Sequence, residues 1–308
     1  MKPPVLVICF NRPELLVRRL NELAMSSVLP NQVIVSIDGP RNSDEAEIWN
    51  NFNFIGYEGK YSYSLKFVRR SKNLGCTNHI ITAVTEVIEE YHMVIVVEDD
   101  VVVGTRFIES MITGFKVISS NDSIGTVGGF SPFHKGLMPL SRNYWRKSSY
   151  FSAWGWGTTK KFWDNFVPLN EINDIEHFLE TSSNWMNMTE RKKKIWLTRF
   201  HRGVWDYNVQ FILFHKNQKN LLPKFRLIDN EGFSDSRSTH TKHQRPWSLF
   251  GEGYSSLPPQ NIAGTSSFSL RSKIWSWVDS NLWAADGHFN SRAREMGIRT
   301  LLRKILSF

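Results

Sequence analysis

The chain has 308 residues and a formal net charge of +9, from 38 Lys and Arg against 29 Asp and Glu. Hydrophobic residues make up 41% and aromatic residues 13%, which excludes a disordered chain, because disordered chains lack the apolar surface that offsets the entropy of ordering. Two cysteines exclude a disulfide scaffold and fit a reducing compartment. The excess of positive charge favours acidic partners such as nucleotides, nucleic acid or anionic lipid.

The first 130 residues alternate between strand and helix patterns. Val5 to Phe10 is a continuous apolar run, typical of a strand buried on both faces. Pro13 and Glu14 suit the start of a helix. The alternation predicts an α/β fold with a mostly parallel sheet and right-handed crossovers. Strands are expected over 5–10, 32–37, 64–69 and 93–97, and helices over 13–23, 44–53, 79–91 and 107–118.

The rest of the chain is less regular. It predicts a strand over 125–130, an aromatic and glycine loop over 151–157, and helices over 159–166, 174–187, 191–200 and 205–214. A short strand over 223–228 then leads into a polar loop over 229–243. Residues 244–282 show no clear pattern.

Polar residues follow three of the predicted parallel strands, at the point where each strand ends. They are Asn11-Arg12, Asp38 and the triplet Glu98-Asp99-Asp100. Ligands of parallel sheets bind at the carboxyl ends of the strands, so we expect a site at this edge. Taken alone, Asp38 is best explained by the Asp-Gly-Pro turn, and Arg12 is either a surface residue or an anion contact.

The acidic triplet is the sharpest chemical signal. Adjacent carboxylates repel one another unless solvent or a cation neutralises them, and Mg²⁺ or Mn²⁺ takes oxygen ligands together with bound phosphates. An acidic loop after a buried strand is the alternative, and the pattern alone favours neither interpretation.

Three further segments carry weaker signals. In Trp154-Gly155-Trp156-Gly157, exposed tryptophans would stack on sugar rings, whereas core packing is the alternative. Asp206 lies at a predicted helix start, where capping is the common role. His240 lies in the polar loop and is either a phosphate or metal contact or a solvated residue.

In chain order, these segments resemble nucleotide-sugar glycosyltransferases of the GT-A fold, among them N-acetylglucosaminyltransferase I and its bacterial sugar-transferase relatives. The resemblance covers residues 4–243 and implies a mostly parallel, Rossmann-like central sheet flanked by helices, with a helical C-terminal extension. It rests on six segments in the family's order, which are 5–12, 33–38, 94–100, 153–157, 205–206 and 222–240.

The resemblance also implies a role for each residue at the donor side. Asp100 would ligate Mn²⁺ (or Mg²⁺), while Glu98 and Asp99 would contact the donor sugar and the ribose. The nucleotide would be held by Arg12, Asp38, Asn73 and His240. No side chain clearly matches the family's base-stacking histidine, although Asn73 and His79 lie near its place.

On the acceptor side, the resemblance implies that Trp154, Gly155 and Trp156 line the acceptor and that Asp206 is the catalytic base of an inverting transfer. The family carries two adjacent acids after the tryptophan, and here the second is Tyr207. The expected enzyme is therefore a metal-dependent glycosyltransferase. It would move a sugar such as N-acetylglucosamine from a UDP-linked donor to a glycan or lipid-linked acceptor in bacterial surface polysaccharide synthesis. A nucleotidyltransferase and an inactive sugar-binding module are the alternatives.

The expected organisation is a glycosyltransferase domain over 1–245, with a nucleotide-sugar-binding half (1–130) and an acceptor half (131–245), followed by an extension over 246–308. Residues 290–308 form a basic amphipathic pattern, read either as a helix in the membrane interface or as a helix docked on the core. No signal peptide or spanning stretch is visible, so we expect a cytoplasmic protein, peripheral at the inner membrane face if the tail binds lipid. No nucleic-acid-binding motif is found, and no nucleic acid is expected.

Overall fold

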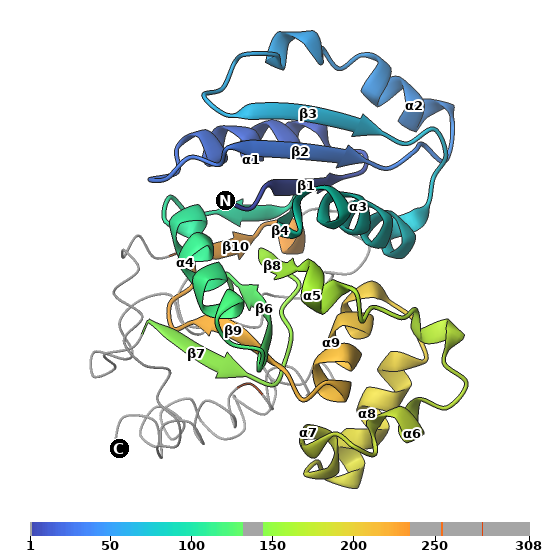
Figure 1. Ribbon diagram of the computed structural model, residues 1–308. Helices are drawn as coiled ribbons and strands as arrows, with labels where there is room; N and C mark the ends of the chain where they lie inside the picture. Colours follow the sequence, from blue (N-terminus) through green and yellow to red (C-terminus); the bar gives the residue numbers. More distant parts are fainter. Residues whose placement is uncertain (1, 132–143, 235–253, 255–278, 280–308) are drawn as a thin grey trace.

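The computed structural model describes residues 2–131, 144–234, 254 and 279 (Figure 1). Within these residues, eight strands form one sheet in the order β3-β2-β1-β4-β8-β6-β9-β7, and β5 and β10 form a separate pair. The strands of the main sheet are β1 Val5–Cys9, β2 Gln32–Ile37, β3 Ser64–Arg69, β4 Met93–Glu98, β6 Ile124–Gly128, β7 Trp145–Ser148, β8 Trp156–Thr159 and β9 Lys219–Pro223. The small pair consists of β5 Val101–Val103 and β10 Ile228–Asn230.

Helices flank this sheet. They are α1 Pro13–Ala24, α2 Ser43–Asn50, α3 Gly75–Tyr91, α4 Phe107–Ser119, α5 Lys160–Trp163, α6 Ile175–Leu179, α7 Ser183–Met186, α8 Glu190–Phe200 and α9 Trp205–His215. Single turns of 3₁₀-helix span Ile55–Tyr57, Leu169–Glu171 and Gly232–Ser234 (η3). The mixed α/β fold with a mostly parallel central sheet is confirmed, and the expected helix over 290–308 lies outside the described residues.

Two hydrophobic cores lie on the two faces of the sheet. Val5 and Val7 of β1 face one core, whereas Leu6 and Ile8 face the other, because side chains alternate along a strand. Helices α1 and α4 close the first core, and α3 and α9 close the second. The apolar run in β1 is therefore explained by burial on both faces, as the sequence predicts.

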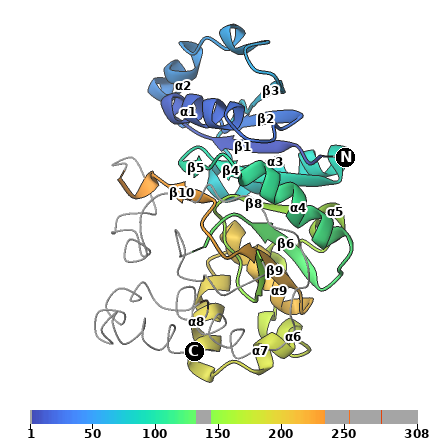
Figure 2. The same ribbon diagram turned by 90° about the vertical axis from the view of Figure 1, so that its left-hand side faces the viewer.

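The parallel strands β3, β2, β1 and β4 follow one another through the upper half of Figure 1. Beside β4 the direction reverses, because β8 pairs antiparallel with both β4 and β6. The pair β5–β10 lies beside α1, off the main sheet (Figure 2). This pairing returns the chain at residue 230 to the end of β4.

The expected loop over 151–157 is wrong at its end, because β8 begins at Trp156 and lies in the middle of the sheet. Gly157 allows close packing here. A Cβ at this position would lie 2.8 Å from the carbonyl oxygen of Val94 and 2.8 Å from the ring of Phe115. The glycines that suggested a flexible loop are therefore packing residues of a central strand.

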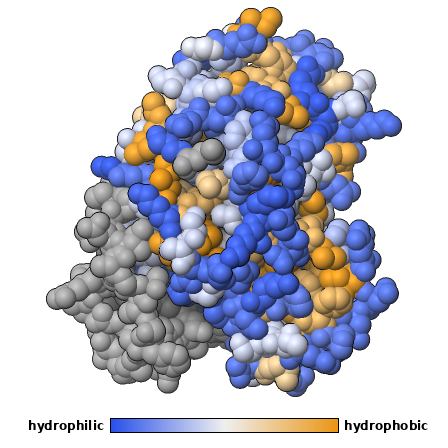
Figure 3. Space-filling model, in the orientation of Figure 1, coloured by the Kyte–Doolittle hydropathy of each residue, from blue (hydrophilic) through white to orange (hydrophobic). Residues whose placement is uncertain are grey.

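The described surface in Figure 3 is largely hydrophilic, with hydrophobic residues in small scattered groups. No helix among the residues placed in the structure is long and apolar enough to cross a membrane. Two residues from the expected extension are described. The ring of Tyr254 lies against Gly104, and Asp279 forms a buried ion pair with Arg146 of β7. The boundary expected at 245 lies outside the described residues.

Candidate functional site

The acidic edge, defined as Glu98, Asp99 and Asp100, lies at the carboxyl end of β4. The register pairs Ile8 of β1 with both Ser36 of β2 and Glu98 of β4, so these three strands end at the same edge of the sheet. Hydrogen bonds extend this alignment beyond the strands, because Asp99 N donates to the Ile8 carbonyl at 3.0 Å. The expected meeting of the three polar strand ends is therefore present in the fold.

Arg12 is the counter-ion of the acidic edge. Its Nε donates to Asp99 Oδ2 at 3.2 Å, its Nη2 donates to Asp99 Oδ1, and the same Nη2 lies 3.3 Å from Asp100 Oδ2. Burial alone would lower the pKa of Arg12, but the charges of Asp99 and Asp100 raise it above its ordinary value. In the sequence, Arg12 is expected at the nucleotide, whereas in the structure it neutralises the acids themselves.

Ionising all of the acidic edge is unfavourable even with Arg12 beside it. Burial raises the pKa of Asp99 to about 7, with Arg12 opposing and Asp100 adding to the rise. Burial, followed by the charges of Asp100, Asp99 and Asp206, raises the pKa of Glu98 well above its usual range. A site of this kind gains from an additional cation, because a nearby positive charge favours the ionised carboxylates.

Asp38 and Asn73 form a separate hydrogen-bonded unit at the end of β2. Asp38 is buried, and its two carboxylate oxygens accept four bonds, from Gly39 N (2.9 Å), Leu74 N (2.9 Å), Gly75 N (3.0 Å) and Asn73 Nδ2 (3.1 Å). These bonds join the turn after β2 to the start of α3. A nucleotide contact from Asp38, as the resemblance implies, would replace one of them.

His79 is buried behind this unit rather than facing the edge. Its Nε2 lies 2.8 Å from Ser36 Oγ, and burial lowers the pKa of His79 to about 4, against a raising effect from Asp38 and with a further lowering from Arg70. The imidazole is therefore a neutral core group, and stacking on a nucleotide base is not available to it.

This burial predicts a pH-dependent loss of stability. Above pH 6.5 the imidazole of His79 is mostly neutral in the folded and in the unfolded protein. Below pH 6.5 the unfolded chain binds a proton at this imidazole, whereas the folded protein does not. The contribution of His79 to the free energy of unfolding should therefore fall by about 2 kcal/mol between pH 7 and pH 5. The raised pKa of Asp99 acts in the opposite direction, so the effect of His79 is the difference between this protein and a variant without the imidazole. Urea unfolding at both pH values would measure it, with the double variant Ser36→Ala, His79→Leu as control. If the free energy of unfolding changed equally between pH 7 and pH 5 in the two proteins, His79 would not be a buried neutral group.

Asp206 is placed on the side of the acidic edge by two stacked tryptophans. Trp156 pairs with Val96 of β4, two residues before Glu98, and the ring of Trp205 stacks on Trp156 at 5.5 Å and 24°. Asp206, the next residue, lies in the first turn of α9 and is near enough for its charge to raise the pKa of Glu98. A fourth carboxylate from the far half of the chain is thus added to the site.

Cys76, in the first turn of α3, is an exposed residue that lies close enough to the acids to be affected by their charges. Partial desolvation is the largest cause that raises the pKa of its thiol, to about 12, and the charges of Glu98, Asp206, Asp100 and Asp38 add to the rise, in that order. No signal in the sequence marks Cys76 as a neighbour of the acids, because its position follows from the packing of α3 against α9.

The expected acceptor platform is wrong for Trp156, whose side chain is fully buried in the core. Gly155 has φ +56° and is buried, because a Cβ would lie 3.1 Å from Ile228 and Phe107. Trp154 is half-buried and meets Phe130 and Phe233 edge-on, at 5.0 and 5.9 Å. Trp154 therefore remains the candidate for stacking on a sugar, and His240 lies outside the described residues.

A turn within the polar loop that the sequence predicts over 229–243 lies beside Asp100. Asn230 ends β10 opposite Val101, and Glu231 N donates to the Asp100 carbonyl at 2.9 Å. Two arginines of α1 hold Glu231, with Arg18 Nη1 at 3.0 Å and Arg19 Nη2 at 3.1 Å from its carboxylate oxygens. The turn is thereby fixed against Asp100, next to α1.

The turn packs so closely against Asp100 that only glycine fits at position 232. A Cβ on Gly232 would overlap Asp100 Oδ2 and lie 3.0 Å from Asn230 Oδ1. Among the residues that the structure describes, no three His, Cys, Asp or Glu side chains converge as a complete metal site. A hard cation held by Asp100 would therefore take further ligands from amide, phosphate or water oxygens, which suits Mg²⁺ or Mn²⁺.

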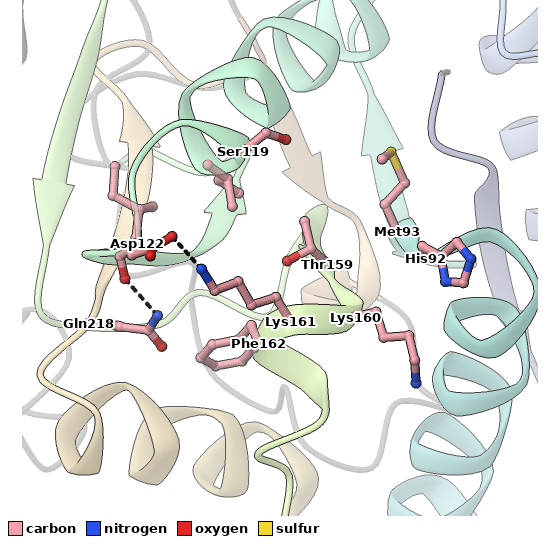
Figure 4. A pocket seen from close by; sticks show the side chains of 11 residues that line it. His92, Met93, Ser119, Asp122, Thr159, Lys160, Lys161, Phe162 and Gln218 are labelled. Atoms are coloured by element: carbon pink, nitrogen blue, oxygen red, sulfur yellow. Dashed lines mark hydrogen bonds and ion pairs between the residues drawn. The ribbon is translucent and has the colours of Figure 1, made fainter.

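A hollow lies at the opposite end of β4, beside His92 and Met93 (Figure 4). Its lysines are ion-paired, since Lys160 Nζ lies 2.6 Å from Glu89 and Lys161 Nζ lies 2.6 Å from Asp122. The length of β4 separates this hollow from the acidic edge. It has no place in the site described above.

No protein-family model and no curated protein matches the chain. Among solved structures, S. aureus TarS 1-349 matches 74% of this chain and 59% of its own length, with 13% identity and a TM-score of 0.41. The same protein with UDP-GlcNAc matches 46% of this chain and 36% of its own length, with 20% identity and a TM-score of 0.31. A mannosyltransferase from Pyrobaculum calidifontis with GDP-Man and Mn²⁺ matches 52% and 45%, with 12% identity and a TM-score of 0.35. At these values, the case for function rests on the site.

Proposed function

We propose that this protein is a metal-dependent glycosyltransferase that uses a nucleotide diphosphate sugar. The observation that carries the proposal is the acidic edge at the carboxyl end of β4, where Arg12 from the end of β1 bridges Asp99 and Asp100. Asp206 of α9 lies near enough for its charge to act on Glu98. Binding of a phosphate-bearing donor at such an edge agrees with the general placement of ligands on these sheets. The resemblance of the chain to GT-A enzymes supports the same conclusion.

Each residue then has a part in the transfer. A divalent cation, when bound, neutralises the charge that develops on the leaving diphosphate. Asp100 would hold that cation, and Arg12, which already bridges Asp99 and Asp100, would keep the acids in place. Asp206 would accept the proton of the acceptor hydroxyl. The transfer is inverting if the acceptor oxygen attacks the sugar on the face opposite the leaving diphosphate. Trp154 would line the acceptor.

The donor proposed is UDP-linked, with N-acetylglucosamine as the sugar, on the strength of the resemblance. The acceptor class is a glycan or a lipid-linked glycan of a bacterial surface polysaccharide. Residues 290–308 would bring the enzyme to the inner face of a membrane that carries such an acceptor. The alternative is a nucleotidyltransferase of related fold. In that case, replacing the acids would abolish the transfer of a nucleotidyl group, and no sugar transfer would be detected in the parent protein.

Thermal unfolding with a panel of UDP and GDP sugars, with and without Mn²⁺, tests the donor site. A donor at a hundredfold excess over its dissociation constant should add about 2.7 kcal/mol of stability, in a Mn²⁺-dependent manner. Asp100→Asn should abolish the shift, whereas Asp44→Asn, an exposed acid in the first turn of α2, should keep it. The proposal would be overturned if no donor stabilised the protein. It would also be overturned if the stabilisation were retained in Asp100→Asn.

A further inference from the structure

Positive charge gathers in the sequence directly before Asp206. Residues 190–204, which comprise α8 and the turn that leads into α9, contain six Lys and Arg and a single acid, Glu190. We propose that Arg199 and Arg202, here called the arginine pair, bind a phosphate group of the acceptor close to the hydroxyl that Asp206 deprotonates. This inference rests on the proposed function, because it concerns the acceptor of the same transfer.

The first argument is the way Arg199 is held. Its guanidinium carbon lies 4.8 Å from the centre of the Trp196 ring and 6.0 Å from the centre of the Tyr207 ring. The two rings meet edge to face, with their centres 6.3 Å apart at 87°. Stacking on aromatic rings fixes the guanidinium plane, and the N–H donors in that plane form the fork that suits a phosphate. Packing between α8 and α9 therefore orients Arg199 for an anion.

The second argument is the link between the arginine pair and Asp206 through Tyr207. Arg202 donates a hydrogen bond to the Tyr207 hydroxyl. Burial, followed by the charge of Asp206, raises the pKa of Tyr207, and Arg199 and Arg202 oppose this rise. Both arginines therefore reach the side chain that directly follows the proposed base. A second acid at this position would repel a phosphate, whereas the hydroxyl accepts from Arg202 and keeps its own proton to donate.

The third argument is the distribution of charge along the site. The charge of Asp206 acts on Glu98 at the acidic edge and on Tyr207 beside the arginine pair, so Asp206 is common to a negative and a positive end. The diphosphate of the donor belongs to the negative end, where the proposed cation neutralises it. An anion at the positive end is then a group of the acceptor. The acceptor class is a glycan with a phosphate ester near the accepting hydroxyl.

The binding test is calorimetric titration of the full-length chain with inorganic phosphate, in the absence of metal ions. The double variant Arg199→Gln, Arg202→Gln should weaken phosphate binding at least about tenfold, because charge-assisted hydrogen bonds are lost. The double variant Arg191→Gln, Lys194→Gln removes the same charge from exposed positions of the same helix and should change the affinity less than about twofold.

A single variant covers the case in which loss of the Arg199 stack unfolds the protein. Arg202 is exposed, and Arg202→Gln alone should weaken phosphate binding at least about threefold.

Steady-state transfer separates the acceptor from the donor. With a saturating donor and membrane extract as the acceptor, inorganic phosphate should raise the KM for the extract and leave kcat unchanged. Removing the arginine pair should raise this KM at least about tenfold and abolish the effect of phosphate. The Mn²⁺-dependent stabilisation by the donor should stay at the parental value.

Three results would contradict the role of the arginine pair and leave the proposed function standing. The first is phosphate binding that is absent in the parent protein or equally weakened in the two double variants. The second is loss of the donor-induced stabilisation without the arginine pair, which would assign the anion to the donor. The third is a pair that is needed for binding to phosphatidylglycerol vesicles but not to phosphate, which would indicate docking on lipid. Absence of donor binding in the parent protein would instead overturn the proposed function.

Discussion

Replacing Asp206 by Asn is expected to lower the rate of sugar transfer by roughly 10²–10⁴-fold, the usual contribution of a general base. The amide keeps the shape and retains an oxygen that accepts the bond from Tyr207 N, seen at 3.0 Å for Asp206 Oδ1, but it does not take up a proton. Trp205 remains stacked on Trp156, so the start of α9 should stay in place. The loss should therefore fall on turnover and not on folding.

Two measurements separate this effect from a binding defect. Release of the nucleotide diphosphate in the presence of membrane extract reports transfer, and thermal unfolding reports donor binding. Asp206→Asn should keep the donor-induced shift and lose release, whereas Glu190→Gln, an exposed acid at the start of α8, should change neither. A variant that transfers at the parental rate would exclude Asp206 as the base.

Replacing Asp279 by Ala is expected to lower the free energy of unfolding by about 3–5 kcal/mol, because it leaves Arg146 as a buried charge without its carboxylate. The side chains of the two residues are 5% and 2% exposed, and the pair joins β7 to a residue beyond the expected domain boundary. Urea unfolding would measure the loss. If residue 279 belonged to an independent unit, the transition of the main body would not move.

Two controls accompany this prediction. Asp122→Ala breaks the exposed pair with Lys161 and should cost less than about 1 kcal/mol, because surface ion pairs contribute little. The double variant Arg146→Met, Asp279→Leu should be more stable than Asp279→Ala alone, since it removes the unbalanced charge. A loss below about 1 kcal/mol for Asp279→Ala would contradict the buried pair.

The sequence predicts those parts of the fold that local patterns determine. The run 5–10 and the helix from Pro13 are present within a residue or two, because burial on both faces and the proline at the helix start leave a local signature. Short strands such as β5 and β10 carry no such signature, since each is only three residues long and exists through its pairing with the other.

The site divides in the same way. The acidic edge follows from strand ends, which the sequence marks with turn residues. The bonds between Arg12 and Asp99 depend on register, the burial of Trp156 depends on its neighbours in the sheet, and the place of Asn230 depends on a distant strand. The spacing of residues along the sequence predicts none of these three features. An Asp-Asn-Glu-Gly run directly after an apolar pair is the one sequence signal that marks the turn at 229–232.

The pairing of β5 with β10 also fixes when the site comes into being. The ribosome makes Asp100 long before it makes Asn230 and Gly232, with an interval on the order of 10 s at synthesis rates of about 5–20 residues per second. During that interval β5 has no partner strand, and the turn that Arg18 and Arg19 hold through Glu231 is missing beside Asp100. The acidic edge thus reaches its final surroundings only after most of the chain has been made.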